Sequence, residues 1–261
     1  MLAFYAELRG GKATWWVNLL NVNEYFSGKR NNKRAFLVSL ILIYHKMSKN
    51  NLTVGLINFI EDEIMPRYEN FDKAHDRRHA FTVMSQSLQL TRFYEVDVAM
   101  VYTIAAYHDL GLCEGRATHH TASARIVRED ERLKQFFTPE QIETIADAVE
   151  DHRASNTREP RTIYGKIIAE ADRIIEPGTI ITRTVQYGLS HYPMLTKEEH
   201  IARAVAHIKE KYGRGGYLRL WIPESPNAAR LEEFRKVIDN EGELRRNLEA
   251  VYCEEVGGCE K

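Results

Sequence analysis

Residues 96–111 read VDVAMVYTIAAYHDLG, and this stretch decides the fold class. Its apolar side chains recur with a helical period, which predicts a helix over residues 96–109. That helix ends in the polar pair His108 and Asp109. Neighbouring side chains on a helix point about 100° apart, so the pair can flank one ion from two sides, or Asp109 can bridge two ions. Gly111 follows and can end the helix there, which would leave an opening beside the pair.

A polar side chain on an apolar helix face recurs in the segments around this pair. The flanking helices and the residues they carry are 76–91 with His79, 120–133 with His120, 139–152 with His152 and 162–175 with Asp172. A single histidine of this kind is usually a core residue that has found a hydrogen-bond partner. Five consecutive helices that each bury such a group favour a metal site, because a buried imidazole or carboxylate is costly unless it is paired or bound. The donor set suits a divalent transition metal, namely Fe, Mn, Zn, Co or Ni.

The helical period also extends beyond this region, and the sequence contains no alternating strand series or internal repeat. Further helices are predicted at 50–67, 197–212 and 227–251. Residues 1–46 lack a helical period and are either a poorly ordered extension, as a mis-assigned start codon would produce, or a packed appendage. We therefore expect an all-α protein divided into an extension at 1–46, a metal-binding core at 47–180 and a C-terminal helical region at 181–261.

Bulk composition restricts the class of partner and the compartment. The 261 residues carry a formal net charge of −1, so no global field attracts a nucleic-acid polymer. The longest apolar run, residues 35–44, is too short to span a membrane, and no small-residue cleavage site follows it. The three cysteines form no CxxC pair, which argues against a disulfide framework. Together these features predict a cytoplasmic protein without membrane contact.

The order of the six polar residues resembles the pattern of a known family. They are His79 in HDRRH, His108 and Asp109 in AAYHDLG, His120 in HTASA, His152 in HR, and Asp172 in GKIIAEADR. This H…HD…H…H…D series over residues 55–178 resembles the HD-domain superfamily of metal-dependent phosphohydrolases. Two subgroup signatures are missing: no GYP follows the HD pair, and LGLC stands where (p)ppGpp hydrolases have an acidic ED dipeptide.

The resemblance implies an HD-domain helical bundle with a helical C-terminal extension and one or two bound metal ions. The ligands it implies for a first ion are His79, His108, Asp109 and Asp172. It implies that His120 and His152 hold a second ion with Asp109 bridging, and that these three residues are catalytic. His119 can take the place of His120, although the register of the following Ser-Ala favours His120. His120 and His152 can alternatively bind one ion weakly or hold a substrate phosphate.

Candidate residues for holding a phosphate flank these motifs. They are His75, Arg78, Arg153 and Lys166, each of which is also explained as an ordinary surface group. The predicted reaction is hydrolysis of a phosphate ester or anhydride in a small phosphorylated metabolite, a nucleotide in particular, by metal-activated water. One alternative is a di-iron oxygenase that uses the same ligands to cleave a C–C or C–P bond, and another is a metal-stabilised scaffold. The last helix is predicted to cover the core or to form a homodimer.

Overall fold

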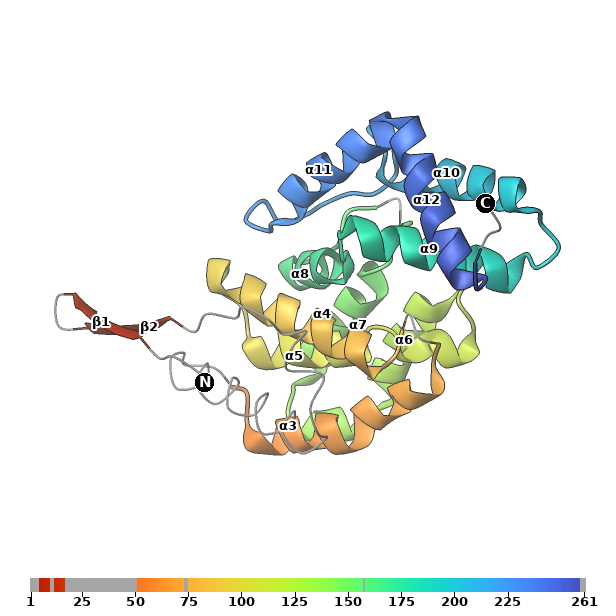
Figure 1. Cartoon of the computed structure of the whole chain (residues 1–261). Coiled ribbons are helices and arrows are strands. Elements are labelled where there is room, and N and C mark those ends of the chain that lie inside the picture. The colour runs from red at the N-terminus through yellow and green to blue at the C-terminus, as the bar shows by residue number, and fades with distance from the viewer. Residues whose placement is uncertain (1–4, 10–11, 17–50, 73–74, 157, 259–261) are drawn as a thin grey trace. The chain divides into compact units, whose positions relative to one another are not determined.

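The structure is a computed structural model that describes residues 5–9, 12–16, 51–72, 75–156 and 158–258 (Figure 1). The chain divides into two compact units, Met1–Lys49 and Asn50–Lys261. In the first unit, β1 (Tyr5–Arg9) and β2 (Lys12–Trp16) pair as an antiparallel hairpin in which Tyr5 is opposite Trp16. The sequence reading missed this hairpin, because strands of five residues are too short for their period of two to stand out. The rest of residues 1–46 lies outside the described residues.

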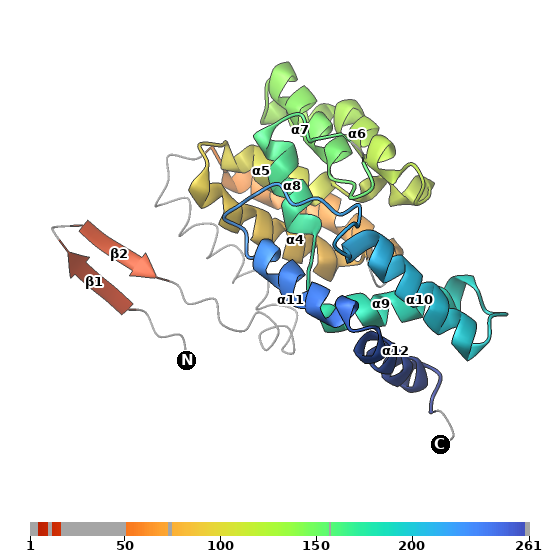
Figure 2. The same ribbon diagram turned by 90° about the horizontal axis from the view of Figure 1, so that it is seen from above.

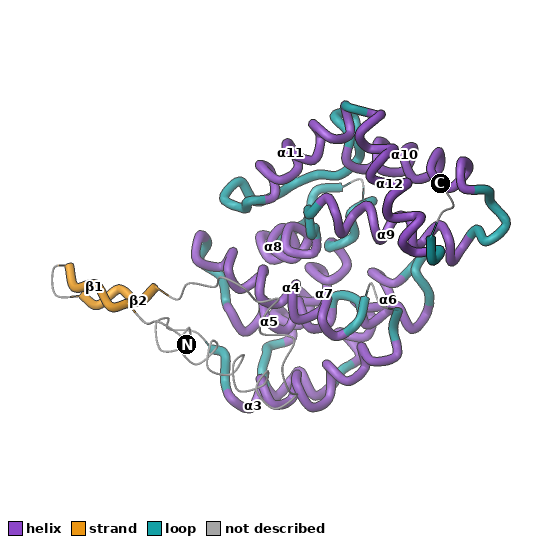
Figure 3. Tube along the Cα trace, in the orientation of Figure 1, coloured by secondary structure: helices purple, strands orange, loops and turns teal. Residues whose placement is uncertain are grey.

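The described elements of the second unit are all helical, so the predicted all-α class holds for this unit (Figure 3). Its α-helices are α3 (Val54–Phe59), α4 (Arg77–Leu90), α5 (Val98–Tyr107), α6 (His119–Glu129), α7 (Pro139–Asp151), α8 (Ile163–Asp172), α9 (Pro177–His191), α10 (Lys197–Tyr212), α11 (Asn227–Asp239) and α12 (Glu241–Glu255). Shorter helical turns join them: a π-helical turn at Ile60–Ile64, and 3₁₀ turns at Met65–Asn70, Thr91–Phe93, Leu110–Glu114 and Glu131–Gln135. None of the described helices is both long and apolar enough to cross a membrane.

Helix α5 is the centre of the core. Every one of its residues is buried, as expected for a helix that is apolar on all sides. Helices α4, α7 and α8 pack against it. The hydroxyl group of Tyr107, the last residue of α5, donates a hydrogen bond to Asp130 at 2.8 Å. This bond ties the end of α5 to the residue that follows α6. This packing holds the end of α5, from which His108 and Asp109 emerge, in a fixed position.

Helices α9 to α12 lie beside this core in Figures 1 and 2 and share a second cluster of buried side chains that includes Ile208, Phe234 and Leu244. Two features of this region differ from the sequence-based expectation. Helix α9 was not predicted, because threonine and glycine residues dilute its apolar stripe. The predicted helix 227–251 is two helices, since the backbone turns at Asn240, whose side chain then caps α12 by accepting from the Glu243 amide.

A buried carboxylate ties this C-terminal region to the core. Glu170 of α8 is fully buried, and its Oε2 accepts a hydrogen bond from the Trp221 amide at 2.8 Å. The carbonyl oxygen of Glu170 accepts another from Asn227 Nδ2 at 3.0 Å. The extended segment 213–226, between α10 and α11, is therefore fixed to the helix that ends in Asp172.

The cysteines partly contradict the sequence-based expectation. Cys113 is a free, exposed thiol, but Cys253 is disulfide-bonded. The cysteine argument for a reducing compartment is thereby removed.

Candidate metal centre and its pocket

The predicted ligands of a first ion meet at one point. His79 Nε2 lies 3.3 Å from His108 Nε2 and 3.5 Å from Asp109 Oδ2, and all three residues place a donor atom within 4.8 Å of one another. Asp172 Oδ1 adds a fourth donor, 3.1 Å from His79 Nε2 and 3.9 Å from His108 Nε2. Three different helices supply these residues at their ends, so the core helices α4, α5 and α8 fix the group.

A second group forms on the other side of Asp109. His119 Nε2 lies 3.6 Å and His152 Nε2 3.5 Å from Asp109 Oδ1, and the two nitrogen atoms are 3.2 Å apart. Asp109 thus points Oδ2 at the first group and Oδ1 at the second. A carboxylate with one oxygen atom facing each of two nitrogen-rich groups has the arrangement needed to bridge two metal ions.

The second group contains His119, not the His120 preferred from sequence. His119 lies one helical turn before Ser123, and Ser123 Oγ accepts a hydrogen bond from the Gly111 amide at 2.8 Å. Residues four apart share a helix face, so His119 points toward the HD turn as Ser123 does. His120 is rotated away, and its Nδ1 lies 3.2 Å from Arg153 Nη1. In the sequence both residues have a helical spacing to Ser123, four positions for His119 and three for His120, so the pattern alone does not separate them.

Three of the histidines are held in the tautomer that a metal ligand requires. The Nδ1 atoms of His108, His119 and His152 lie 2.8, 2.8 and 2.5 Å from the carbonyl oxygens of Ala105, Arg116 and Val149. A carbonyl oxygen only accepts, so each Nδ1 carries the hydrogen atom and the neutral ring has its lone pair on Nε2. In all three rings this Nε2 is the atom that faces Asp109.

The charges within the cluster are strongly coupled. Burial alone would raise the pKa of Asp109, but the adjacent His108, His152 and His79 outweigh it and hold that pKa well below its usual range. Burial lowers the pKa of His79, yet hydrogen bonds to Asp109 and Asp172 dominate and raise it to about 9. Burial and the nearby His152 lower the pKa of His119 to about 4.

These residues fit a divalent transition metal. Nitrogen donors and carboxylate oxygens converge in a buried helical core, and His79, His108, Asp109 and His152 are each less than a tenth exposed. Without a cation, the carboxylates there are compensated only by imidazoles, of which His79 has a buried Nδ1 with no hydrogen-bond partner among the described residues. The two groups, joined by Asp109, can hold one or two ions.

Gly111 allows the two groups to approach each other. A Cβ atom at this position would lie 2.2 Å from the carbonyl oxygen of His119 and 2.4 Å from the amide nitrogen of Ser123. Only glycine leaves room for the first turn of α6 to pack on the HD turn. The sequence-based role for Gly111, ending the helix, is secondary, since α5 already ends at Tyr107.

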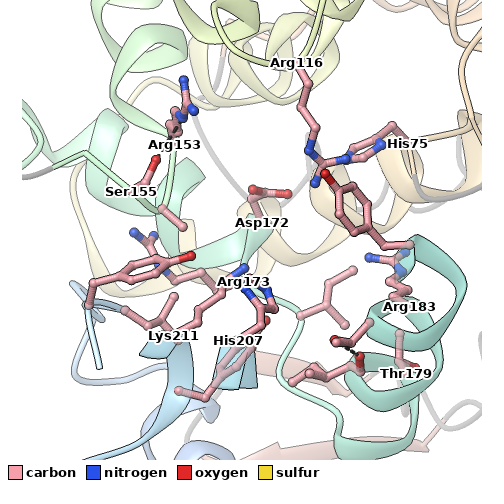
Figure 4. A pocket seen from close by; sticks show the side chains of 18 of the residues that line it. His75, Arg116, Arg153, Ser155, Asp172, Arg173, Thr179, Arg183, His207 and Lys211 are labelled. Carbon is pink, nitrogen blue, oxygen red and sulfur yellow. Dashed lines mark hydrogen bonds between the residues drawn. The ribbon is translucent and has the colours of Figure 1, made fainter. Parts of the chain in front are cut away.

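A cavity of about 730 Å³ opens directly onto the metal centre and extends to α9 and α10 (Figure 4). Two of the four predicted substrate-binding residues, His75 and Arg153, line it. Arg78 does not, because its guanidinium group is exposed and bonded to Asp76 at 2.9 Å. Lys166 also lies outside the lining and forms an ion pair with Glu159 at 2.5 Å.

Sequence reasoning missed most of the cationic lining. Six arginine and lysine side chains line the cavity against three carboxylates; the cations are Arg116, Arg153, Arg173, Arg183, Arg203 and Lys211. His207 also lines the cavity. Surface cations have no sequence period, so only their positions in the fold distinguish these from other charges.

One family of known proteins matches the part of the chain that holds both groups. The family model described as the HD domain matches residues 77–175, a range that includes all the residues of both groups. A solved structure described as a predicted HD superfamily hydrolase from an uncultured Thermotogales bacterium is 20% identical and matches with a TM-score of 0.39 over 57% of this chain and 81% of its own. No curated protein matches the sequence. Residues 77–175 therefore match the HD domain, the segment that holds both groups of residues.

Proposed function

We propose that this chain is a metal-dependent phosphohydrolase that cleaves a phosphate ester or anhydride of a small metabolite, a nucleotide in particular. The HD-domain match over residues 77–175 supports a metal-dependent hydrolase at the coarse level. The observation that carries the finer proposal is the position of Asp109, whose two carboxylate oxygens face separate imidazole groups at the floor of a cation-lined cavity. Two metal ions and a cationic wall are suited to a phosphoryl group.

Each group of residues has a separate role in the proposed reaction. His79, His108, Asp109 and Asp172 would hold one ion, and Asp109, His119 and His152 would hold the other. Ions bound there supply an acidified water molecule and neutralise charge on the phosphoryl oxygens. Asp109 stays ionised because its pKa is held low by the surrounding imidazoles despite burial, so it can accept a hydrogen bond from the attacking water and orient it.

Arg153 and His75 are placed to contact the substrate. Arg153 donates from Nη1 to the Ala117 carbonyl and from Nε to Ser155 Oγ at 2.9 Å, which fixes the guanidinium plane at the cavity wall. Its Nη2 has no hydrogen-bond partner among the described residues and is available to a phosphate oxygen. His75 Nδ1 lies 2.8 Å from Asp72 Oδ1, so its Nε2 is the atom left to accept a hydrogen bond.

The di-iron oxygenase alternative uses the same ligands, and no feature of the cavity favours it over hydrolysis. Oxygen uptake with iron-loaded protein is its distinguishing assay. A small-molecule substrate follows from the enclosed cavity. A cytoplasmic location, the absence of a nucleic-acid partner and a possible homodimer remain predictions.

The test begins with metal analysis of the purified protein, followed by a screen of nucleotides and phosphomonoesters with added manganese, cobalt, nickel, iron or zinc. We expect phosphate release that depends on metal. His108→Ala and Asp109→Ala should each abolish turnover and lower the bound metal. Wild-type turnover in either variant would refute the proposed site.

A further inference from the structure

The cavity extends well beyond the metal centre. Arg173 directly follows α8, Arg183 projects from α9 and Lys211 from α10, and their side chains surround the cavity in Figure 4. Arg183 and Lys211 lie outside the residues matched by the HD model. A volume of about 730 Å³ is in the range of sites that enclose a whole small molecule, whereas one phosphoryl group fills only a small part of it.

These three cations have no carboxylate in direct contact within the described part of the chain. Among the described residues, none of them forms an ion pair within 4.0 Å. Arg173 is only 7% exposed, and its Nε and Nη1 atoms are buried without a hydrogen-bond partner in that same set of residues. Burying a guanidinium group without a partner is strongly unfavourable, because the charge loses its hydration and gains no compensating interaction. The burial of Arg173 is explained if an anionic ligand binds its guanidinium group.

The carboxylates of the metal centre do not explain the excess of cations. Asp109 and Asp172 already face the imidazoles of His79, His108, His119 and His152, and bound metal ions would compensate them further. The third carboxylate in the lining, Glu210, is exposed to solvent. Asp172 acts electrostatically on Arg173 and Lys211, and Glu170 acts on Arg173, but among the described residues none of these carboxylates lies within 4.0 Å of the three cations. The wall formed by α9 and α10 therefore contains cations that no described carboxylate pairs with directly.

We propose that Arg173, Arg183 and Lys211 form a second anion subsite, which binds a phosphate or similar anionic group of the substrate away from the phosphoryl group at the metal centre. The proposal rests on the proposed function for the first group and extends it, because it restricts the substrate to molecules with two separate anionic groups. Tyr212 lies beside these cations, and the Lys211 ammonium group sits over its ring, 5.0 Å from the centroid, which helps to position this cation in the cavity wall.

The test compares ligands that differ only in a second phosphate. Titration calorimetry at fixed salt would measure binding of adenosine 5′-monophosphate against adenosine 3′,5′-bisphosphate, and of fructose 6-phosphate against fructose 1,6-bisphosphate. We expect at least one bisphosphate to bind about tenfold or more tightly than its monophosphate, and Arg183→Gln or Lys211→Met to remove most of that advantage. Arg183→Lys and Lys211→Arg should retain it, which separates loss of charge from loss of fold.

Arg214→Gln is the matched control, because Arg214 is an exposed cation near the end of α10 that pairs with Glu232 and Asp239 outside the cavity. It should leave the ratio of affinities unchanged. The subsite is refuted if neither bisphosphate binds more tightly than its monophosphate, or if the advantage survives both charge-removing variants. The proposed function has its own readout, metal-dependent release of p-nitrophenol from p-nitrophenyl phosphate by the same preparation.

Discussion

The two adjacent histidines at the start of α6 allow a sharp test of the metal centre. Either His119→Ala or His120→Ala removes one imidazole from the same turn of the same helix. The geometry predicts that only the first change disables the site. The two variants are controls for each other, because composition, charge and position along the helix are matched.

The losses of kcat that we expect for the two variants differ by more than an order of magnitude. His119 Nε2 lies 3.2 Å from His152 Nε2 and 3.6 Å from Asp109 Oδ1, so its loss leaves the second group with two residues. Removing a group that merely supports a metal ligand costs about 10–100-fold, so removing the ligand should lower kcat by at least ~100-fold. His120 has one polar contact in the site, 3.2 Å from Arg153 Nη1, worth about 1 kcal/mol or roughly fivefold.

The assay combines metal content per chain by mass spectrometry with kcat on p-nitrophenyl phosphate, after thermal melts have shown that both variants fold. We expect His119→Ala to lose one ion and most of its turnover. We expect His120→Ala to retain its metal content and to lose no more than the roughly fivefold in turnover given above. The opposite pattern, metal and activity lost in His120→Ala but kept in His119→Ala, would refute the assignment of the second group.

Three further predictions concern stability and protons. In metal-free protein the raised pKa of His79, about 9, means that its stabilising contribution is fully present below about pH 6.5 and is lost as the pH rises through 9. Metal must displace that proton, so calorimetry in two buffers at pH 7 should show release of about one proton per chain, and affinity should rise from pH 7 to 9. Gly111→Ala should destabilise the fold by about 1–3 kcal/mol in denaturant titration, because its Cβ meets the backbone of α6; an unchanged midpoint would contradict this. Glu170→Ala should cost about 1–3 kcal/mol by leaving backbone donors unpaired, and Glu170→Gln, which keeps an acceptor, should cost less.

The structure brings together the four residues that the sequence pattern grouped around a first ion, and the reason is physical. His79, the HD pair and Asp172 each lie at the end of an apolar helix, where the helical period shows which face is buried. The second group was predicted less well, since His119 and His120 are adjacent and both follow the same apolar pattern. The hydrogen bond from Gly111 to Ser123, which sets the phase of α6, exists only in the folded chain.

The cavity wall was beyond the reach of sequence patterns. Arg183 and Lys211 come from helices that the family resemblance does not cover, and a cation on an amphipathic helix usually faces solvent. Conversely, Lys166 lies within a matched motif yet pairs with Glu159 away from the cavity. Proximity in sequence to a ligand therefore gave less information than the packing of α9 and α10 over the core.

The contacts of Glu170 have a practical consequence for anyone who shortens this protein. A fragment that stops where the family match stops, at residue 175, would retain all the residues of both groups. It would nevertheless remove the amide donors of residues 221 and 222 from a carboxylate that is 0% exposed and lies two residues before Asp172. We therefore expect the smallest fragment able to hold the proposed metal centre to be longer than the segment that matches the family, and to include the helices that follow it.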